Sequence, residues 1–168
     1  MGRRSVKENK SIYMLSREQH GLTREHASDV IDGITPSRLE KLENGRTTVQ
    51  PEDVVMLARA YQEPGLCNYY CTHECAIGRK SVPEIEEKEL PQIAVEMVNR
   101  ISRLNQKKDL ILQIAEDGTV TEDEYRDFSD LKQLIDSLVV SAETLKLWLN
   151  KAGATGEVDL KSLEQTKS

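Results

Sequence analysis

The chain has 168 residues and a formal net charge of −6, and 31% of its residues are charged. This length suits one domain, or a small domain with an appended element, and it argues against a large multidomain enzyme. Only 4% of the residues are aromatic, and Gly and Pro are few. Such a composition is typical of a mostly helical protein that contains at least one long helix.

The charge is distributed unevenly along the chain. Residues 1–66 carry ten basic and ten acidic side chains, residues 67–80 have a net charge of +1, and residues 81–168 have a net charge of −7. An acidic segment repels phosphate groups, so any contact with nucleic acid is expected in the first half of the chain.

Apolar runs in the sequence are short. The longest uninterrupted one covers residues 54–58, whereas a helix that spans a bilayer needs about 18 apolar residues. The charged N-terminus is not followed by an apolar region, so it does not resemble a secretory signal. We therefore expect a soluble cytoplasmic protein without membrane contacts.

The segment from 11 to 62 predicts a series of short helices separated by turn signals. Thr35 followed by Pro36 is a typical helix start, because the hydroxyl caps the helix and proline fits its first position. Asn44-Gly45 is a typical helix end, since both residues tolerate the left-handed conformation. The first expected helix ends near residue 20, and the second runs from 24 to about 31. The third runs from 36 to 43, and the fourth begins at 51.

Three segments of this region carry a resemblance to a known family. They read G-L-T-R-E at 21–25, I-T-P-S-R-L-E-K-L-E-N-G-R at 34–46 and L-A-R-A-Y at 57–61. Their order and spacing resemble the Cro/XRE family of helix-turn-helix repressors, and the L-E-N-G-R ending is the most specific part. The resemblance covers about residues 11–63. It implies a lambda-repressor-like DNA-binding domain over residues 1–66, with the 36–43 helix as the recognition helix.

The expected 36–43 helix would have leucines on one face and polar side chains on the other. Leu39 and Leu42 are three residues apart and are expected to face the domain core. The polar face would then be free to enter the major groove of DNA, and cations or hydroxyls beside it could hold phosphates. The predicted base contacts are Ser37, Arg38 and Lys41, and the predicted phosphate contacts are Arg24, Arg46, Thr47 and Thr48.

Residues 67–84 are expected to form a connector between the first domain and the following helices. All three cysteines of the chain lie in its first nine residues. Cys67, Cys71, His73 and Cys75 supply four soft ligands, enough for tetrahedral zinc, although their spacing matches no standard zinc motif. In a helix the three cysteines would share one face and His73 would point away from it. The alternative is therefore that the cysteines form a small buried stripe that packs the first domain onto the next helices.

The rest of the chain predicts a long antiparallel two-helix hairpin, so the expected fold class is all-α. Residues 85–115 and 124–150 each show apolar residues at alternating spacings of three and four. The expected seam consists of Leu90, Ala94, Met97, Ile101, Leu104, Lys108, Ile111 and Ala115 on the first helix, and of Phe128, Leu131, Ile135, Leu138, Ala142, Leu145 and Leu149 on the second.

Both helices also carry apolar residues outside this seam. A hairpin of two helices cannot cover two apolar faces, so the surplus face is expected to pack against another subunit or against the first domain. The leading expectation is a homodimer formed through the hairpin, residues 85–152. The final segment, residues 153–168, is expected to be a flexible tail. The apolar residues outside the seam are Ile93 and Val98 on the first helix, and Leu134, Val139 and Trp148 on the second.

The turn between the two helices resembles the second half of a calcium-binding loop, with Gly118 at the bend and Glu124 at the last ligand position. The third position of such a loop would be Ala115, which offers no side-chain ligand. We therefore expect a helix end at Gly118 and a capping box from Thr121 to Glu124.

No catalytic motif occurs in the sequence, and His20 and His26 have no partner at catalytic spacing, so an enzyme is not expected. The leading hypothesis is a sequence-specific transcriptional regulator, a homodimer that binds double-stranded DNA at a two-fold operator through the 36–43 helix. One alternative is a helical protein-interaction module that uses the same fold as a scaffold. Another is a metal or redox sensor in which the connector with Cys67 and Cys75 is the switch.

Overall fold

The computed structural model describes residues 9–159 and residue 162 of the chain. Every regular element in this part is an α-helix, as the sequence predicts. These residues divide into two units, one formed by the described residues up to 84 and from 150 onward and the other by residues 85–149. Among the described residues, no helix is both long and apolar enough to span a membrane.

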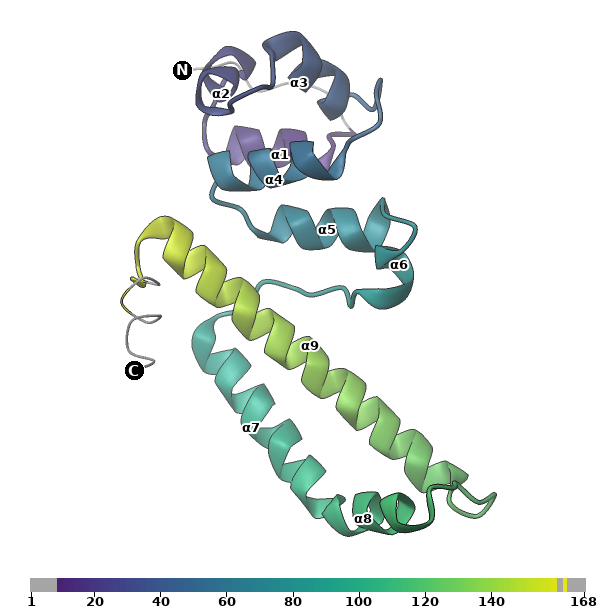
Figure 1. The fold of residues 1–168 in the computed structure, drawn as a ribbon. Helices are drawn as coiled ribbons and strands as arrows, with labels where there is room; N and C mark the ends of the chain where they lie inside the picture. Colours follow the sequence, from purple (N-terminus) through teal and green to yellow (C-terminus); the bar gives the residue numbers. More distant parts are fainter. Residues whose placement is uncertain (1–8, 160–161, 163–168) are drawn as a thin grey trace. The chain divides into compact units, whose positions relative to one another are not determined.

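The first unit begins with four short helices, α1 (Ile12–Gln19), α2 (Arg24–Val30), α3 (Pro36–Glu43) and α4 (Pro51–Ala60) (Figure 1). Their bounds agree closely with the expected ones. A side-chain hydroxyl caps each of the first three helices, because Ser11, Thr23 and Thr35 accept hydrogen bonds of 3.2–3.3 Å from the backbone N–H three residues ahead. Gly45, whose φ is +66°, follows the end of α3, as predicted.

Apolar residues of these helices form one core. Leu39, Leu57 and Tyr61 have no exposed surface, and Leu42 is almost as deeply buried. The predicted inward orientation of Leu39 and Leu42 is therefore confirmed. Because the two leucines fix which face of α3 packs inside, the polar face of that helix lies at the surface. The other core residues are Tyr13, Ala27, Ile31, Ile34, Val49, Val54, Ala58 and Leu66.

The segment expected to be a connector, residues 67–84, is largely helical. It contains most of α5 (Gly65–His73) and all of α6 (Gly78–Ser81), and α5 packs against α4. Leu66 belongs to the core of the first unit, and Cys67 and Tyr70 pack partly buried against it. The compact unit therefore extends beyond residue 66, the domain end that the sequence suggests.

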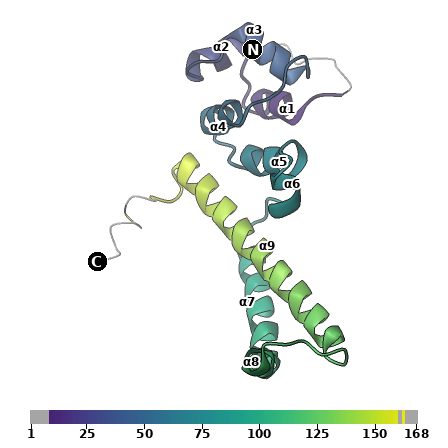
Figure 2. The same ribbon diagram turned by 45° about the vertical axis from the view of Figure 1, so that its right-hand side comes forward.

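The second unit contains α7 (Leu90–Gln106), α8 (Lys108–Asp117) and most of α9 (Tyr125–Thr155). Figures 1 and 2 show α7 and α9 side by side and antiparallel, as the hairpin prediction requires. The expected single helix over residues 85–115 is wrong in two places. It starts only at Leu90, because Pro91 deeper inside a helix would lose a backbone hydrogen bond and clash with the preceding turn. It is also interrupted at Lys107, whose N–H donates to the Leu104 carbonyl at 3.0 Å in a tight turn.

The turn between α8 and α9 has the capping geometry that the sequence predicts. Gly118 has a φ of +68°, and Glu124 Oε2 accepts a hydrogen bond of 3.0 Å from the N–H of Thr121. α9 continues to Thr155, so residues 153–155 of the expected tail are helical. Residues 160, 161 and 163–168 of that tail lie outside the described residues.

The buried stripe of the hairpin differs from the expected seam. Ile93 and Leu134 are buried, whereas their neighbours in the expected seam, Ala94 and Ile135, are exposed. The apolar residues form two adjacent stripes with the same period, so periodicity alone cannot decide which one faces inward. Polar residues of α9 also lie in the buried stripe, so the hydrophobic pattern of the sequence does not identify these positions as buried. The buried residues described in this unit are Ile93, Leu131, Leu134, Ser141, Thr144 and Leu147.

We predict that Gly78→Ala destabilises the first unit. Gly78 is buried, and a Cβ atom at this position would lie 2.2 Å from the carbonyl oxygen of Cys71. α5 and α6 would have to move apart, which should cost about 1–3 kcal/mol of unfolding free energy. Urea denaturation followed by circular dichroism measures this cost. Arg79→Ala, an exposed neighbouring change, is the control and should cost less than about 0.5 kcal/mol; equal stability of the two variants would contradict the prediction.

Candidate nucleic-acid interface

The outward face of α3 carries the residues that are placed best to contact DNA. Ser37 and Lys41 are both exposed and lie one helical turn apart on the side opposite the buried leucines. In the part of the chain that the structure describes, neither side chain has a hydrogen-bond or ion-pair partner. Both are therefore accessible to the base edges of a major groove.

Arg38, the third predicted base contact, is held by a carboxylate of α4. Its Nη2 lies 2.9 and 2.8 Å from the two oxygens of Asp53, and its Nε lies 3.2 Å from Asp53 Oδ1. Asp53 is only 3% exposed and also accepts the backbone N–H of Gln50. Arg38 thus links α3 to α4, and a contact with a base would require this bidentate ion pair to open.

Arg24, a predicted phosphate contact, belongs to a cluster around the buried carboxylate of Glu43. Glu43 Oε2 accepts hydrogen bonds from Arg24 Nε at 2.8 Å and from Arg17 Nη2 at 3.0 Å, and Glu43 Oε1 accepts from Arg17 Nε. Burial alone would lower the pKa of Arg17, but the hydrogen bond and the charge of Glu43 raise it. Two arginines around one carboxylate leave an excess positive charge, and the Arg24 side chain is 30% exposed.

The loop after α3 contains the remaining predicted phosphate contacts. Arg46 and Thr48 are exposed, and Thr47 is half-buried. Arg46 Nη1 lies 3.6 Å from Glu40 Oε1, in an ion pair that is open to solvent. Such a pair contributes little free energy, so Arg46 can turn toward a phosphate at small cost.

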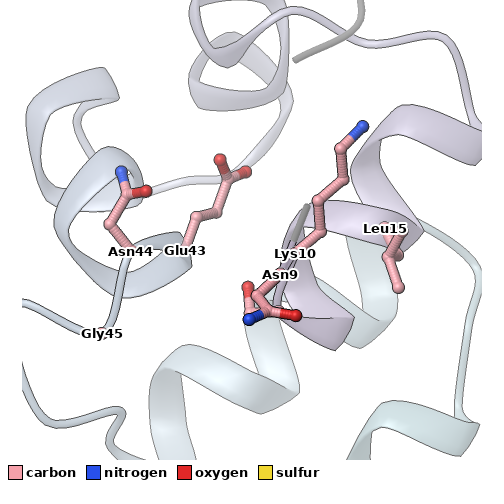
Figure 3. Close-up of a pocket in the computed structure, with 7 residues that line it drawn as sticks. Asn9, Lys10, Leu15, Glu43, Asn44 and Gly45 are labelled. Carbon is pink, nitrogen blue, oxygen red and sulfur yellow. The ribbon is translucent and has the colours of Figure 1, made fainter. Parts of the chain in front are cut away.

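A hollow of about 590 Å³ lies beside the end of α3 (Figure 3). Figure 3 shows Glu43, Asn44 and Gly45 on one side of it and Lys10 and Leu15 on the other. Lys10 Nζ forms an ion pair of 2.6 Å with Glu18. The sequence pattern gives no signal for Lys10, because it precedes the first helix and stands in no motif. The lining is completed by Asn9 and Ser11.

The cysteines lie on and after α5, half-buried and without disulfides. Burial raises the pKa of the Cys67 thiol. The ring of His73 stacks on Tyr69 at 4.3 Å, and His73 Nε2 lies 3.6 Å from Glu84. Within residues 9–159 and 162, no group of three or more His, Cys, Asp or Glu residues is placed to hold a metal ion. Zinc binding by Cys67, Cys71, His73 and Cys75 stays a prediction, which metal analysis of anaerobically purified protein tests.

We predict that Arg17→Ala is strongly destabilising. The Glu43 side chain has no exposed surface, and this change removes the more deeply buried of its two arginine partners. Breaking a buried ion pair on one side typically costs about 3–5 kcal/mol of unfolding free energy. Arg46→Ala makes the same change of charge in an exposed pair and should cost at most about 1 kcal/mol. Urea denaturation of both variants measures the difference, and similar midpoints would show that the cluster does not stabilise the domain.

Comparison with protein families agrees with this geometry. Residues 15–66 match the model of a family described as a helix-turn-helix domain, and this range contains α2, α3 and α4 with most of the core residues around them. Comparisons with curated proteins and with solved structures found no match. The match and the arrangement of the helices lead to the same conclusion: residues 15–66 of this chain form a helix-turn-helix domain, consistent with the Cro/XRE type.

Proposed function

We propose that the protein is a sequence-specific transcriptional regulator that binds a two-fold DNA operator as a homodimer. The observation that carries the proposal is the exposed polar face of α3 inside a helix-turn-helix domain. In such domains the second helix of the motif enters the major groove, and residues around it hold the backbone.

The contacts follow from exposure and charge. Lys41 can donate to guanine O6 and N7. The Ser37 hydroxyl can donate to an acceptor on a base edge or accept from a donor there. Arg46 and Thr48, with Thr47 beside them, can bind phosphates after α3, and Arg24 can do so at the start of α2. Arg38 acts in this proposal chiefly as a positioning residue, because Asp53 holds its guanidinium.

Homodimerisation is supported by apolar surface on the second unit. Val95, Val98 and Ile101 of α7 are 61%, 65% and 48% exposed. On α9, Phe128, Ile135 and Val139 are 40–47% exposed. Soluble monomers rarely expose so many large apolar residues on two neighbouring helices. A second copy would cover them, and it would double a first domain whose own charge balance predicts weak DNA binding.

The same apolar surface would also suit a protein-interaction module that uses the helix-turn-helix fold as a scaffold. The two functions differ in one observable. A regulator enriches a particular sequence from random duplex DNA, and a protein-interaction module enriches none.

We predict different effects for a base contact and a phosphate contact. Lys41→Ala should cost about 1–3 kcal/mol of binding free energy and relax the preference at one base pair of each half-site. Arg46→Ala should weaken binding to all sequences alike and reduce the slope of log K against log salt by about 1. Fluorescence anisotropy with the enriched duplex, at several salt concentrations, measures both quantities. Binding that does not depend on salt would contradict the assignment of the phosphate contact.

We predict that the wild-type chain has about twice its monomer mass of 19.0 kDa in solution. Val98→Glu on α7 or Ile135→Glu on α9 places a charge among the exposed apolar residues described above and should give a monomer. Gln133→Glu adds the same charge at an exposed position of α9 that does not share a face with Phe128, Ile135 and Val139. This control should remain a dimer. Light scattering at micromolar concentration distinguishes the two states. A monomeric wild type would refute dimerisation through the hairpin.

A further inference from the structure

Glu40 lies on the same outward strip of α3 as the two accessible polar residues. It follows Ser37 by three positions and precedes Lys41 by one, and an α-helix turns by about 100° per residue. The three side chains therefore cover one continuous surface opposite Leu39 and Leu42. A helix that inserts this surface into a major groove brings the Glu40 carboxylate to the base edges together with Lys41.

The Glu40 carboxylate is held loosely. Its partner is Arg46 at 3.6 Å, and the two side chains are 48% and 69% exposed. The other carboxylate of α3, Glu43, is fully buried and accepts charged hydrogen bonds from two arginines. Of the two, only Glu40 can exchange its partner when DNA approaches, because a solvent-exposed ion pair contributes little free energy.

A carboxylate in a major groove discriminates strongly among the bases. Cytosine presents an amino donor at N4, which a carboxylate accepts. Adenine presents an amino donor next to the N7 acceptor, and guanine and thymine present the acceptors O6 and O4. Acceptors and phosphates repel a negative charge, so an unpaired carboxylate at the groove floor is tolerated best opposite cytosine.

We propose that Glu40 is a specificity-determining residue that selects a cytosine in each half-site, beside the base pair that Lys41 contacts. This inference rests on the proposed function, and it names the kind of base pair that the operator contains. On binding, Glu40 exchanges Arg46 for the cytosine amino group, and Arg46 turns to a phosphate. In the free protein both side chains of this ion pair are exposed to solvent, so little free energy opposes the exchange.

The test is selection from random duplex DNA with the full chain, for wild type, Glu40→Gln and Glu52→Gln. A glutamine amide can both donate and accept, which matches adenine N7 and N6. Glu40→Gln should therefore shift one base pair of each half-site from cytosine toward adenine, with the preference for cytosine over adenine falling roughly 5- to 150-fold. Glu52→Gln removes the same charge at an exposed residue of α4 and should leave every preferred base unchanged.

Each outcome separates the possible roles of Glu40. If Glu40→Gln enriches the same sequence as wild type and only raises the affinity for all duplexes, as the loss of any negative charge would, the proposal is overturned. If wild type enriches no sequence at all, the proposed function fails and this inference fails with it. Thermal melting confirms that the variants are folded, which the exposure of Glu40 and Glu52 favours.

Discussion

The arrangement of the helix-turn-helix domain depends on the ion pairs that the buried carboxylate of Glu43 forms with two arginines. Glu43 lies at the end of α3 and binds Arg17 of α1 and Arg24 of α2. Burying a carboxylate costs several kcal/mol unless its partners are close and hydrogen-bonded. A packing in which α3 is rotated or shifted would leave this charge unpaired. The leucines therefore decide which face of α3 is buried, and the ion pairs decide where the helix lies along its neighbours.

The local features of this domain could be predicted from the sequence, because they depend on neighbouring residues. Thr35, Pro36 and Gly45 define both ends of α3, and the leucine spacing defines its inner face. The partners of the arginines could not be predicted in the same way. Arg24 binds a residue 19 positions away and Arg38 one 15 positions away. Only the packed helices bring these groups together, so two of the seven predicted DNA contacts have structural partners that no local pattern indicates.

The hairpin shows a different limit of sequence analysis. Its helices and their antiparallel course were predictable from apolar spacing, but the face that points inward was not. The buried stripe of α9 includes Ser141 and Thr144, whereas Phe128, Ile135 and Val139 lie exposed beside it. Thr144 compensates for its burial by donating to the Val140 carbonyl at 2.8 Å. A buried threonine that bonds to its own helix in this way carries no hydrophobic signal, so hydrophobicity alone does not identify the buried face of α9.

The burial of Cys67 has a consequence for its reactivity. The thiol packs against the domain core from α5, and its pKa is raised by this burial. Because the thiolate is the form that attacks alkylating reagents, the raised pKa and the partial burial both lower the reactivity of this sulfur while α5 stays in place. Detachment of α5 from α4 would expose this sulfur further. The reactivity of Cys67 toward an alkylating reagent therefore depends on how closely α5 packs against the core of the first unit.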